Sequence, residues 1–210
     1  MRKTFTLMWA CMLCLLCLSV QVQAQNRFRS EKGQLEEVRK VVNDSRSFWL
    51  HMFPAAELPD YGFRDEKEKT QAVPGQPIEV YNMYRSFNGA TEVQPAGEFL
   101  VPLLINGKPR VFLTVAFFEG RFQVVSVGEM NLAQEATPYV SRANETKGSQ
   151  LVWLRNLNHS ADFIADAANL VNDASLVFSP LSTAQRASFQ QPIVYSELET
   201  RISKMLVQFD

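Results

Sequence analysis

Two apolar runs separated by a tight-turn dipeptide constrain the fold of this chain more than any other feature of its sequence. Phe99–Ile105 and Val111–Phe118 consist almost entirely of aliphatic, β-branched and aromatic residues, and Asn106-Gly107 lies between them. Asn-Gly between two such runs is the strongest short-range signal for a β-hairpin. The sequence therefore predicts an antiparallel strand pair at the centre of the fold.

Two neighbouring segments extend this pair into a sheet. Glu119-Gly120 forms a second tight turn and leads into the apolar run Phe122–Val127. Before the pair, Ile78–Tyr84 alternates in the manner of a strand. The sequence thus predicts a three-stranded antiparallel meander with Ile78–Tyr84 beside it.

The central strands are apolar on both faces, so the predicted sheet needs a cover on each side. In a sheet with one wet face apolar and polar residues alternate, but Phe99–Ile105 lacks this alternation. One cover is a long helix predicted over Glu31–Phe53. Its apolar residues are spaced three and four positions apart, Ser30 is a candidate N-cap, and Pro54 ends the helix. The second cover comes from the C-terminal half or from a partner chain. This element order is similar to that of cystatin-like inhibitory modules, a likeness that transfers no function.

The remaining segments predict short helices and strands. Segment 55–76, with the charge run Arg64–Lys69, is predicted to be a solvated loop. The pattern then predicts a helix over 132–140 broken near Pro138, a strand over Leu151–Leu157, a helix capped by Ser160 that carries Phe163, Ile164, Ala167 and Val171, a strand over Leu176–Phe178, a helix over Ser182–Phe189, and a final helix starting at the capping box Ser196-x-x-Glu199. The predicted fold class is α+β, with a long N-terminal helix packed on an antiparallel β-meander and a C-terminal α/β portion covering the other face.

The first 24 residues have the features of a cleaved signal peptide. Arg2 and Lys3 precede the uncharged, largely apolar stretch 4–20, and small residues end at Ala24. A membrane-spanning helix needs about 20 apolar residues, and this stretch is shorter. A lipoprotein and an uncleaved anchor are the alternatives. We expect cleavage near Ala24/Gln25, which places the mature protein outside the cell or in a periplasm.

The domain organisation follows from this cleavage. Residues 25–30 are predicted to form a linker, and residues 31–210 a single α+β domain. Possible lobes within this domain are 31–128, which holds the helix and the meander, and 129–210, the α/β portion.

The leader also holds every cysteine of the chain, namely Cys11, Cys14 and Cys17. The mature chain therefore has no disulfide, thiol nucleophile or cysteine metal site. Removing Arg2 and Lys3 with the leader leaves 19 basic and 22 acidic residues, a net charge of −3. This balance does not favour nucleic acid or an anionic membrane as a partner.

The sequence lacks the motifs of the common catalytic chemistries. Its two histidines, His51 and His159, are more than a hundred residues apart, which disfavours a zinc site. No nucleophile elbow, dinucleotide fingerprint, P-loop or EF-hand loop is present. We therefore expect no metal and no cofactor.

Carboxylates remain as candidate catalytic groups. They border the meander or lie four residues apart on the predicted helix after Ser160, and they are Glu98, Glu119, Glu129, Asp162 and Asp166. Turns, helix caps and a solvated helix face account for most of them without catalysis. The alternative is a small exported hydrolase that uses two of them in a cleft between the meander and the C-terminal helices.

The function that the sequence favours is an exported, non-enzymatic binding or inhibitory module. Its partner would be a protein or peptide that contacts the sheet edge or the meander turns 106–109 and 118–121. Lys108 and Arg121 are the basic residues at these two turns and are the candidate partner-binding residues.

Overall fold

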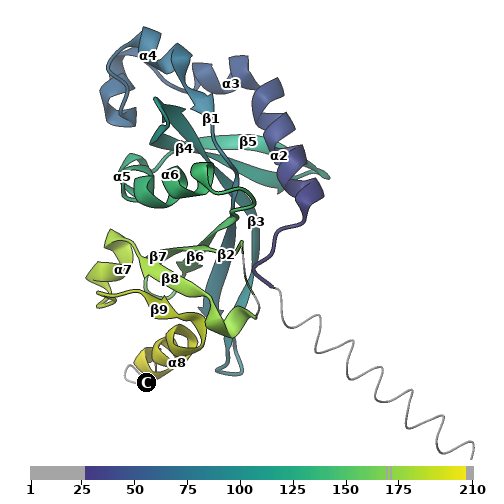
Figure 1. Cartoon of the computed structure of the whole chain (residues 1–210), viewed down its shortest axis with the longest axis vertical. Helices are drawn as coiled ribbons and strands as arrows, with labels where there is room; N and C mark the ends of the chain where they lie inside the picture. The colour runs from purple at the N-terminus through teal and green to yellow at the C-terminus, as the bar shows by residue number, and fades with distance from the viewer. Residues whose placement is uncertain (1–26, 169, 171, 207–210) are drawn as a thin grey trace, which may run out of the picture.

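The computed structural model of the chain describes residues 27–168, 170 and 172–206 (Figure 1). The predicted signal peptide lies outside these residues. The strands are β1 (Val73–Pro74), β2 (Ile78–Arg85), β3 (Thr91–Ile105), β4 (Lys108–Phe118), β5 (Arg121–Gly128), β6 (Leu151–Asn156), β7 (Ala161–Asp166), β8 (Val177–Pro180) and β9 (Ile193–Val194). The α-helices are α2 (Lys32–Asp44), α3 (Arg46–His51), α4 (Glu66–Gln71), α5 (Met130–Glu135), α6 (Thr137–Glu145), α7 (Ser182–Arg186) and α8 (Tyr195–Leu206), with 3-10 turns at Ala55–Tyr61 and Asp173–Ser175.

The strands form one sheet in the order β5-β4-β3-β2-β6-β7-β8-β9, with β1 also paired to β3. The β2–β6 pair is parallel, and the other pairs are antiparallel. The predicted α+β class is therefore confirmed as a mixed fold with a large, mostly antiparallel sheet and several helices.

Strand β3 connects the two halves of the sheet. Its first part pairs with β2, and its last part pairs with β4 through a two-residue turn at Asn106-Gly107. A second two-residue turn, Glu119-Gly120, connects β4 to β5. All four turn residues have positive φ, between 51° and 80°, as two-residue type I′ turns require.

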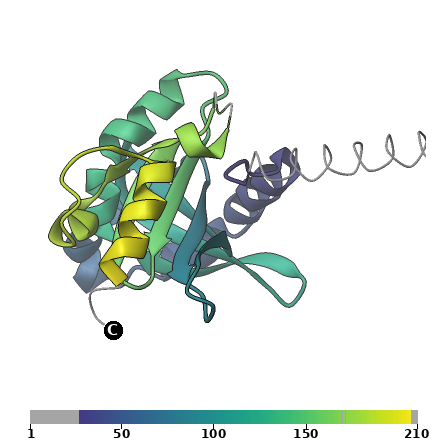
Figure 2. The ribbon, with the colours of Figure 1, turned by 90° about the horizontal axis from the view of Figure 1, so that it is seen from below.

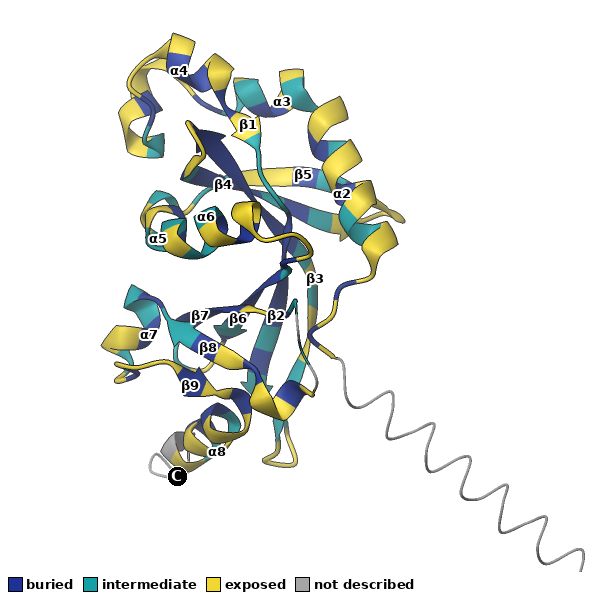
Figure 3. Cartoon of the chain, in the orientation of Figure 1, coloured by how far each residue is buried: buried dark blue, intermediate teal, exposed yellow. Residues whose placement is uncertain are grey.

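The centre of the sheet is buried on both faces. On one face Phe99, Val101 and Leu103 pack in a cluster with Val38 and Trp49 from α2 and α3. On the opposite face Leu100 and Leu104 of β3 pack in a second cluster with Ala133 of α5 and Val140 of α6. Figure 3 shows the buried strands between helices whose outer surfaces are exposed. Two helical layers therefore cover the two-sided apolar sheet.

The prediction of a single helix over Glu31–Phe53 is wrong, because two helices, α2 and α3, occupy this segment. Ser45 lies between α2 and α3, and its hydroxyl donates to the carbonyl of Val41 at 2.7 Å. Such a bond back to the preceding turn bends helices. Ser30 is not the N-cap either: Glu31 occupies that position, and the Ser30 hydroxyl donates to Glu79 instead.

The charge run 64–69, predicted to be a solvated loop, contains helix α4 and is partly buried. Asp65 caps the helix by accepting from the Glu68 backbone N–H at 2.7 Å, and Glu68 accepts from the Arg64 N–H at 2.6 Å. This arrangement is close to a capping box, except that the Glu68 carboxylate reaches the N–H of the residue before the N-cap. Glu68 is only 3% exposed. The bond from the Arg64 N–H and the Arg64 guanidinium hold the pKa of Glu68 below its usual value against the effect of burial, and Arg110 at 3.4 Å adds to this shift.

The predicted helix after Ser160 is also wrong, because the segment is strand β7. Antiparallel pairing places Asn156 opposite Ala161 and Trp153 opposite Ile164. Residues 161, 163 and 165 then face one core and residue 164 faces the other. Val171 lies outside the described residues. The break predicted near Pro138 lies at Ala136, between α5 and α6, and Pro138 itself is in the first turn of α6, where proline is well tolerated.

The segment before α2, predicted as a linker, is anchored to the domain. Phe28 is fully buried and meets Tyr81, Phe178 and Tyr195 edge to face, with ring centroids 5.0–5.4 Å apart. The Arg27 guanidinium donates to Asp173 at 3.1 Å. This segment therefore crosses one face of the sheet as part of the core.

Replacement of Phe28 by alanine tests this anchoring. Loss of a fully buried aromatic side chain should lower the free energy of unfolding by about 3–5 kcal/mol. The control is Phe48→Ala, which removes a ring that is 56% exposed on α3 and should change stability by about 0.5 kcal/mol or less. Urea unfolding measures both, and equal midpoints for Phe28→Ala and the wild type would show that the segment is not part of the core.

Candidate functional site

The two predicted partner-binding residues lie at opposite ends of β4. Lys108 begins the strand and Arg121 follows it, across the Glu119-Gly120 turn. A strand of this length separates its ends by about 33 Å. Both residues are exposed, but the structure does not bring them together into one site.

The histidines form no metal site. His51 is exposed and its Nδ1 lies 2.5 Å from the carbonyl oxygen of Ser47, one turn earlier. His159 follows β6, and its Nε2 is buried without a hydrogen bond. Within the described ranges, no group of three or more histidine, cysteine, aspartate or glutamate side chains is arranged to hold a metal ion.

Three of the predicted carboxylates do converge, and the group at their centre is an arginine. The Arg155 guanidinium lies 3.3 Å from Glu129, 3.3 Å from Asp162 and 3.9 Å from Glu98. We call these four residues the Arg155 cluster. Arg155 was not predicted as a functional residue, since one arginine within an apolar strand gives no sequence signal. The remaining carboxylate at the meander, Glu119, is exposed at the hairpin turn.

Further bonds fix Asp162, whereas Asp166 belongs to another site. Asp162 accepts from the Trp153 Nε1–H at 2.8 Å and from the Thr183 hydroxyl at 3.1 Å. Asp166 accepts from the Ser149 hydroxyl at 2.5 Å and from two backbone N–H groups. The two aspartates share a face of β7, but their partners give each a structural role.

Glu129 has the most unusual environment in the Arg155 cluster. It precedes α5 in a left-handed conformation with φ 59°, which costs a non-glycine residue about 1 kcal/mol or more. Burial raises its pKa, Arg155 opposes this shift, and the charges of Asp162 and Glu98 add to it. It also lines a cavity of about 410 Å³ together with Asp60, Thr183 and Arg186.

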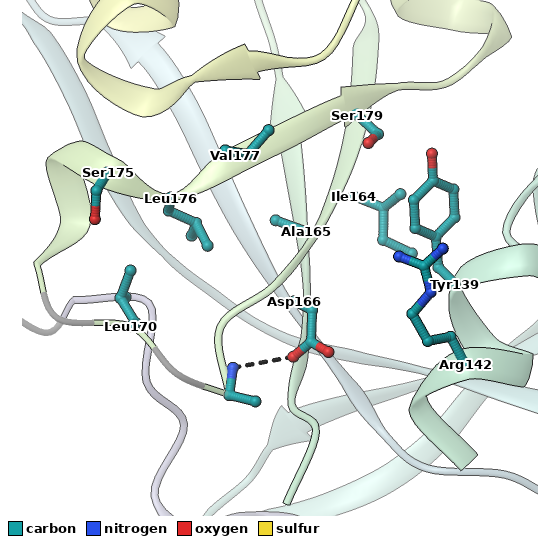
Figure 4. Close-up of a pocket in the computed structure, with 11 residues that line it drawn as sticks. Tyr139, Arg142, Ile164, Ala165, Asp166, Leu170, Ser175, Leu176, Val177 and Ser179 are labelled. Atoms are coloured by element: carbon teal, nitrogen blue, oxygen red, sulfur yellow. Dashed lines mark hydrogen bonds between the residues drawn. The ribbon is translucent and has the colours of Figure 1, made fainter. Parts of the chain in front are cut away.

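A second cavity, of about 480 Å³, lies between α6 and the β7–β8 pair (Figure 4). Tyr139 and Arg142 approach it from the helix, and Asp166 points into it from β7. Asp166 is already committed to the backbone N–H of Ala168 and to Ser149. Asp166 is therefore engaged within the protein, whereas the side chains of Tyr139, Arg142 and Ser179 line the cavity without a polar partner among the described residues.

A third cavity, of about 530 Å³, is lined by phenylalanine rings and by charged side chains, and we call it the hairpin groove. It lies between the N-terminal segment 27–37, strand β3 and the β4–β5 hairpin. The last pair between β3 and β4 is Glu98 with Ala116. Close to this point β3 has a bulge opposite β2: the register between the two strands shifts between Glu79 and Tyr81, and Gly97 in the bulge has φ 71°. Beyond this bulge the hairpin projects from the body of the molecule (teal in Figure 2).

Aromatic rings form the walls of the hairpin groove. Phe122 meets Phe99 and Phe117 edge to face, at centroid distances of 5.5 Å and 5.2 Å. Phe117 is 56% exposed, and the adjacent Phe118 at the hairpin tip is 59% exposed. Two neighbouring exposed phenylalanines on a projecting hairpin are a feature of interaction surfaces.

A buried carboxylate lies at the base of the hairpin groove. Glu79 is 7% exposed, and its Oε2 accepts from the Ser30 hydroxyl and from the Tyr81 hydroxyl, the latter at 2.9 Å. Burial and the Glu79 charge raise the pKa of Tyr81 well above its usual value, so this hydroxyl remains a donor. Glu79 Oε1 has no hydrogen-bond or ion-pair partner among the described residues.

Sequence reasoning did not single out Glu79. The available signal is a glutamate inside a strand that is buried on both faces, where an ionised side chain is rarely found without a partner. Comparison of the chain with models of known protein families, with curated proteins and with solved structures finds no match. In the described part of the chain no helix is long and apolar enough to cross a membrane.

Substitution of Arg155 by glutamine tests the electrostatics of the Arg155 cluster. Because the pKa of Glu129 is raised on folding, the folded state binds more protons than the unfolded state, and stability falls as pH rises above the ordinary value near 4.5. Removal of Arg155 raises this pKa further. We expect Arg155→Gln to cost about 1 kcal/mol at pH 7 and less at pH 4.

Urea unfolding at the two pH values measures this difference. The control is Arg142→Gln, which removes a guanidinium that is exposed on α6 and makes no ion pair within the described residues. Its effect should not depend on pH. A cost of Arg155→Gln that is the same at pH 4 and pH 7 would contradict the role assigned to the cluster.

Proposed function

We propose that this protein is an exported binding module whose partner, a protein or peptide, contacts the β4–β5 hairpin and the hairpin groove. The observation that carries the proposal is the exposure of Phe117 and Phe118 at the tip of a hairpin that projects beside an aromatic-walled cavity. Aromatic side chains, phenylalanine among them, are enriched at protein interfaces relative to the rest of the surface.

Two further features of this region support binding. Strand β5 lies at the edge of the sheet, and Val125 on it is 48% exposed. An edge strand can pair with an extended segment of a partner. Arg121 lies beside Phe118 and adds an exposed charge to the same tip, so this predicted residue belongs to the proposed face. Lys108 lies outside it.

Export is part of the proposal and rests on the leader sequence. The basic start, the apolar stretch and the small residues before Gln25 support secretion or a periplasmic location. Mass spectrometry of the protein from its native host should find the N-terminus at or near Gln25. An intact Met1 on the protein in the cytoplasm would contradict export.

A second candidate function is hydrolysis by carboxylates, and one observation favours it. Glu129 combines a raised pKa with a position on a cavity between α5 and α7, which suits a general acid. Arg155 argues against it, because the guanidinium engages all three carboxylates. The test is turnover of a glycan, ester or peptide by the mature protein. Activity that is lost in Glu129→Gln but kept in Glu119→Gln would establish hydrolysis and reject pure binding.

The binding proposal is tested with a partner captured by the mature protein from its own extracytoplasmic fraction. Phe118→Ala should weaken the affinity about tenfold or more, and Arg121→Glu should weaken it as well. Lys108→Glu is the matched control, because it reverses an exposed charge at the opposite end of β4. Calorimetric titration measures the affinities. An affinity that falls with Lys108→Glu and is unchanged with Phe118→Ala would show that the binding face lies elsewhere.

A further inference from the structure

We propose that the hairpin groove accepts a lysine side chain of the partner, whose ammonium group pairs with Glu79. The inference rests on the proposed function, because it assigns the chemistry of the partner at the same groove. Glu79 supplies the main argument: it is 7% exposed, lines the groove and has no cationic partner among the described residues. A buried carboxylate is costly unless a cation or several hydrogen bonds compensate it.

The hydrogen bonds of Glu79 leave one oxygen for a ligand. Ser30 and Tyr81 both donate to Oε2, so Oε1 remains without a donor. Arginine binds a carboxylate best through two parallel bonds to both oxygens, whereas lysine presents a compact charge to one oxygen. With Oε2 engaged, the available geometry favours lysine over arginine.

The walls of the groove suit the rest of a lysine side chain. Phe99, Phe117 and Phe122 provide apolar surface for its four methylene groups, and long basic side chains commonly bury this stem against apolar residues. Aromatic faces also attract an ammonium group. The groove is therefore apolar along its walls and negative at its base.

The charges around the groove favour a cation as well. Arg27 lines the groove, but its guanidinium pairs with Asp173 at 3.1 Å. The other charged residues that line the groove make no ion pair with a described residue: one is basic, Arg29, and three are acidic, Glu31, Glu37 and Glu79. The local excess is negative, although the rim carries charges of both signs.

The test is an NMR titration of the isotope-labelled mature protein with three blocked amino acids: the N-acetyl methylamides of lysine, arginine and norleucine. Norleucine has the length of the lysine stem without the charge. We expect lysine to shift the backbone signals of Tyr81, Gly97 and Phe99, with arginine weaker and norleucine about tenfold weaker or more. Glu79→Gln, which keeps an acceptor for Ser30 and Tyr81, should weaken lysine binding to the level of norleucine.

Glu37→Gln is the matched control, since it removes an exposed carboxylate at the rim and should change lysine binding less than about twofold. Three results would each overturn the inference. They are an equal loss of lysine binding in the Glu37 and Glu79 variants, tighter binding of arginine than of lysine, and equal binding of norleucine and lysine. Equal binding of norleucine would leave the groove as a binding site without charge selection, so the proposed function would stand. If none of the three compounds shifts a groove signal, the inference fails, and the Phe118→Ala measurement decides the proposed function separately.

Discussion

The burial of β3 on both faces is the constraint on which the rest of the structure depends. Residues Phe99–Ile105 have no polar side chain, and all of them are buried. Each large apolar side chain contributes about 1.5–3 kcal/mol when it leaves water, so neither face can remain exposed. The chain meets this requirement with α2 and α3 on one face and with α5 and α6 on the other. The long strand also joins the β4–β5 hairpin to the half of the sheet that contains β6 to β9 (Figure 1).

The hairpin groove arises where this shared strand changes partners. Strand β3 pairs with β2 along its first part and with β4 along its last part, and the bulge at Gly97 marks the change. The hairpin diverges from β3 beyond Ala116, which leaves a space that the N-terminal segment borders on its other side. Bulges of this kind often redirect side chains beside functional sites. Here the same irregularity places the exposed Phe117 in the lining of the groove that also contains the buried Glu79, so the binding features follow from the topology of the sheet.

The sequence predicted the features that depend on neighbouring residues. Asn106-Gly107 and Glu119-Gly120 determine their turns locally, because two residues of positive φ close a two-residue hairpin. The helix predicted after Ser160 is wrong because apolar residues at 163, 164, 167 and 171 fit a helix, while those of so short a run fit a strand about equally well. Pairing with β6 decides the outcome. The groove and the Arg155 cluster were not predictable in this way, since Glu79 meets Ser30 and Arg155 meets Glu98 only through long-range contacts.

The central claim is that a partner contacts the projecting hairpin, and site-specific photo-cross-linking in the native host tests it most directly. A photoreactive phenylalanine analogue replaces Phe118 in one variant and Phe48 in another, since both rings are more than half exposed and neither replacement disturbs the core. We expect a discrete cross-linked adduct from position 118 and none from position 48. An adduct from position 48 with none from position 118 would contradict the claim.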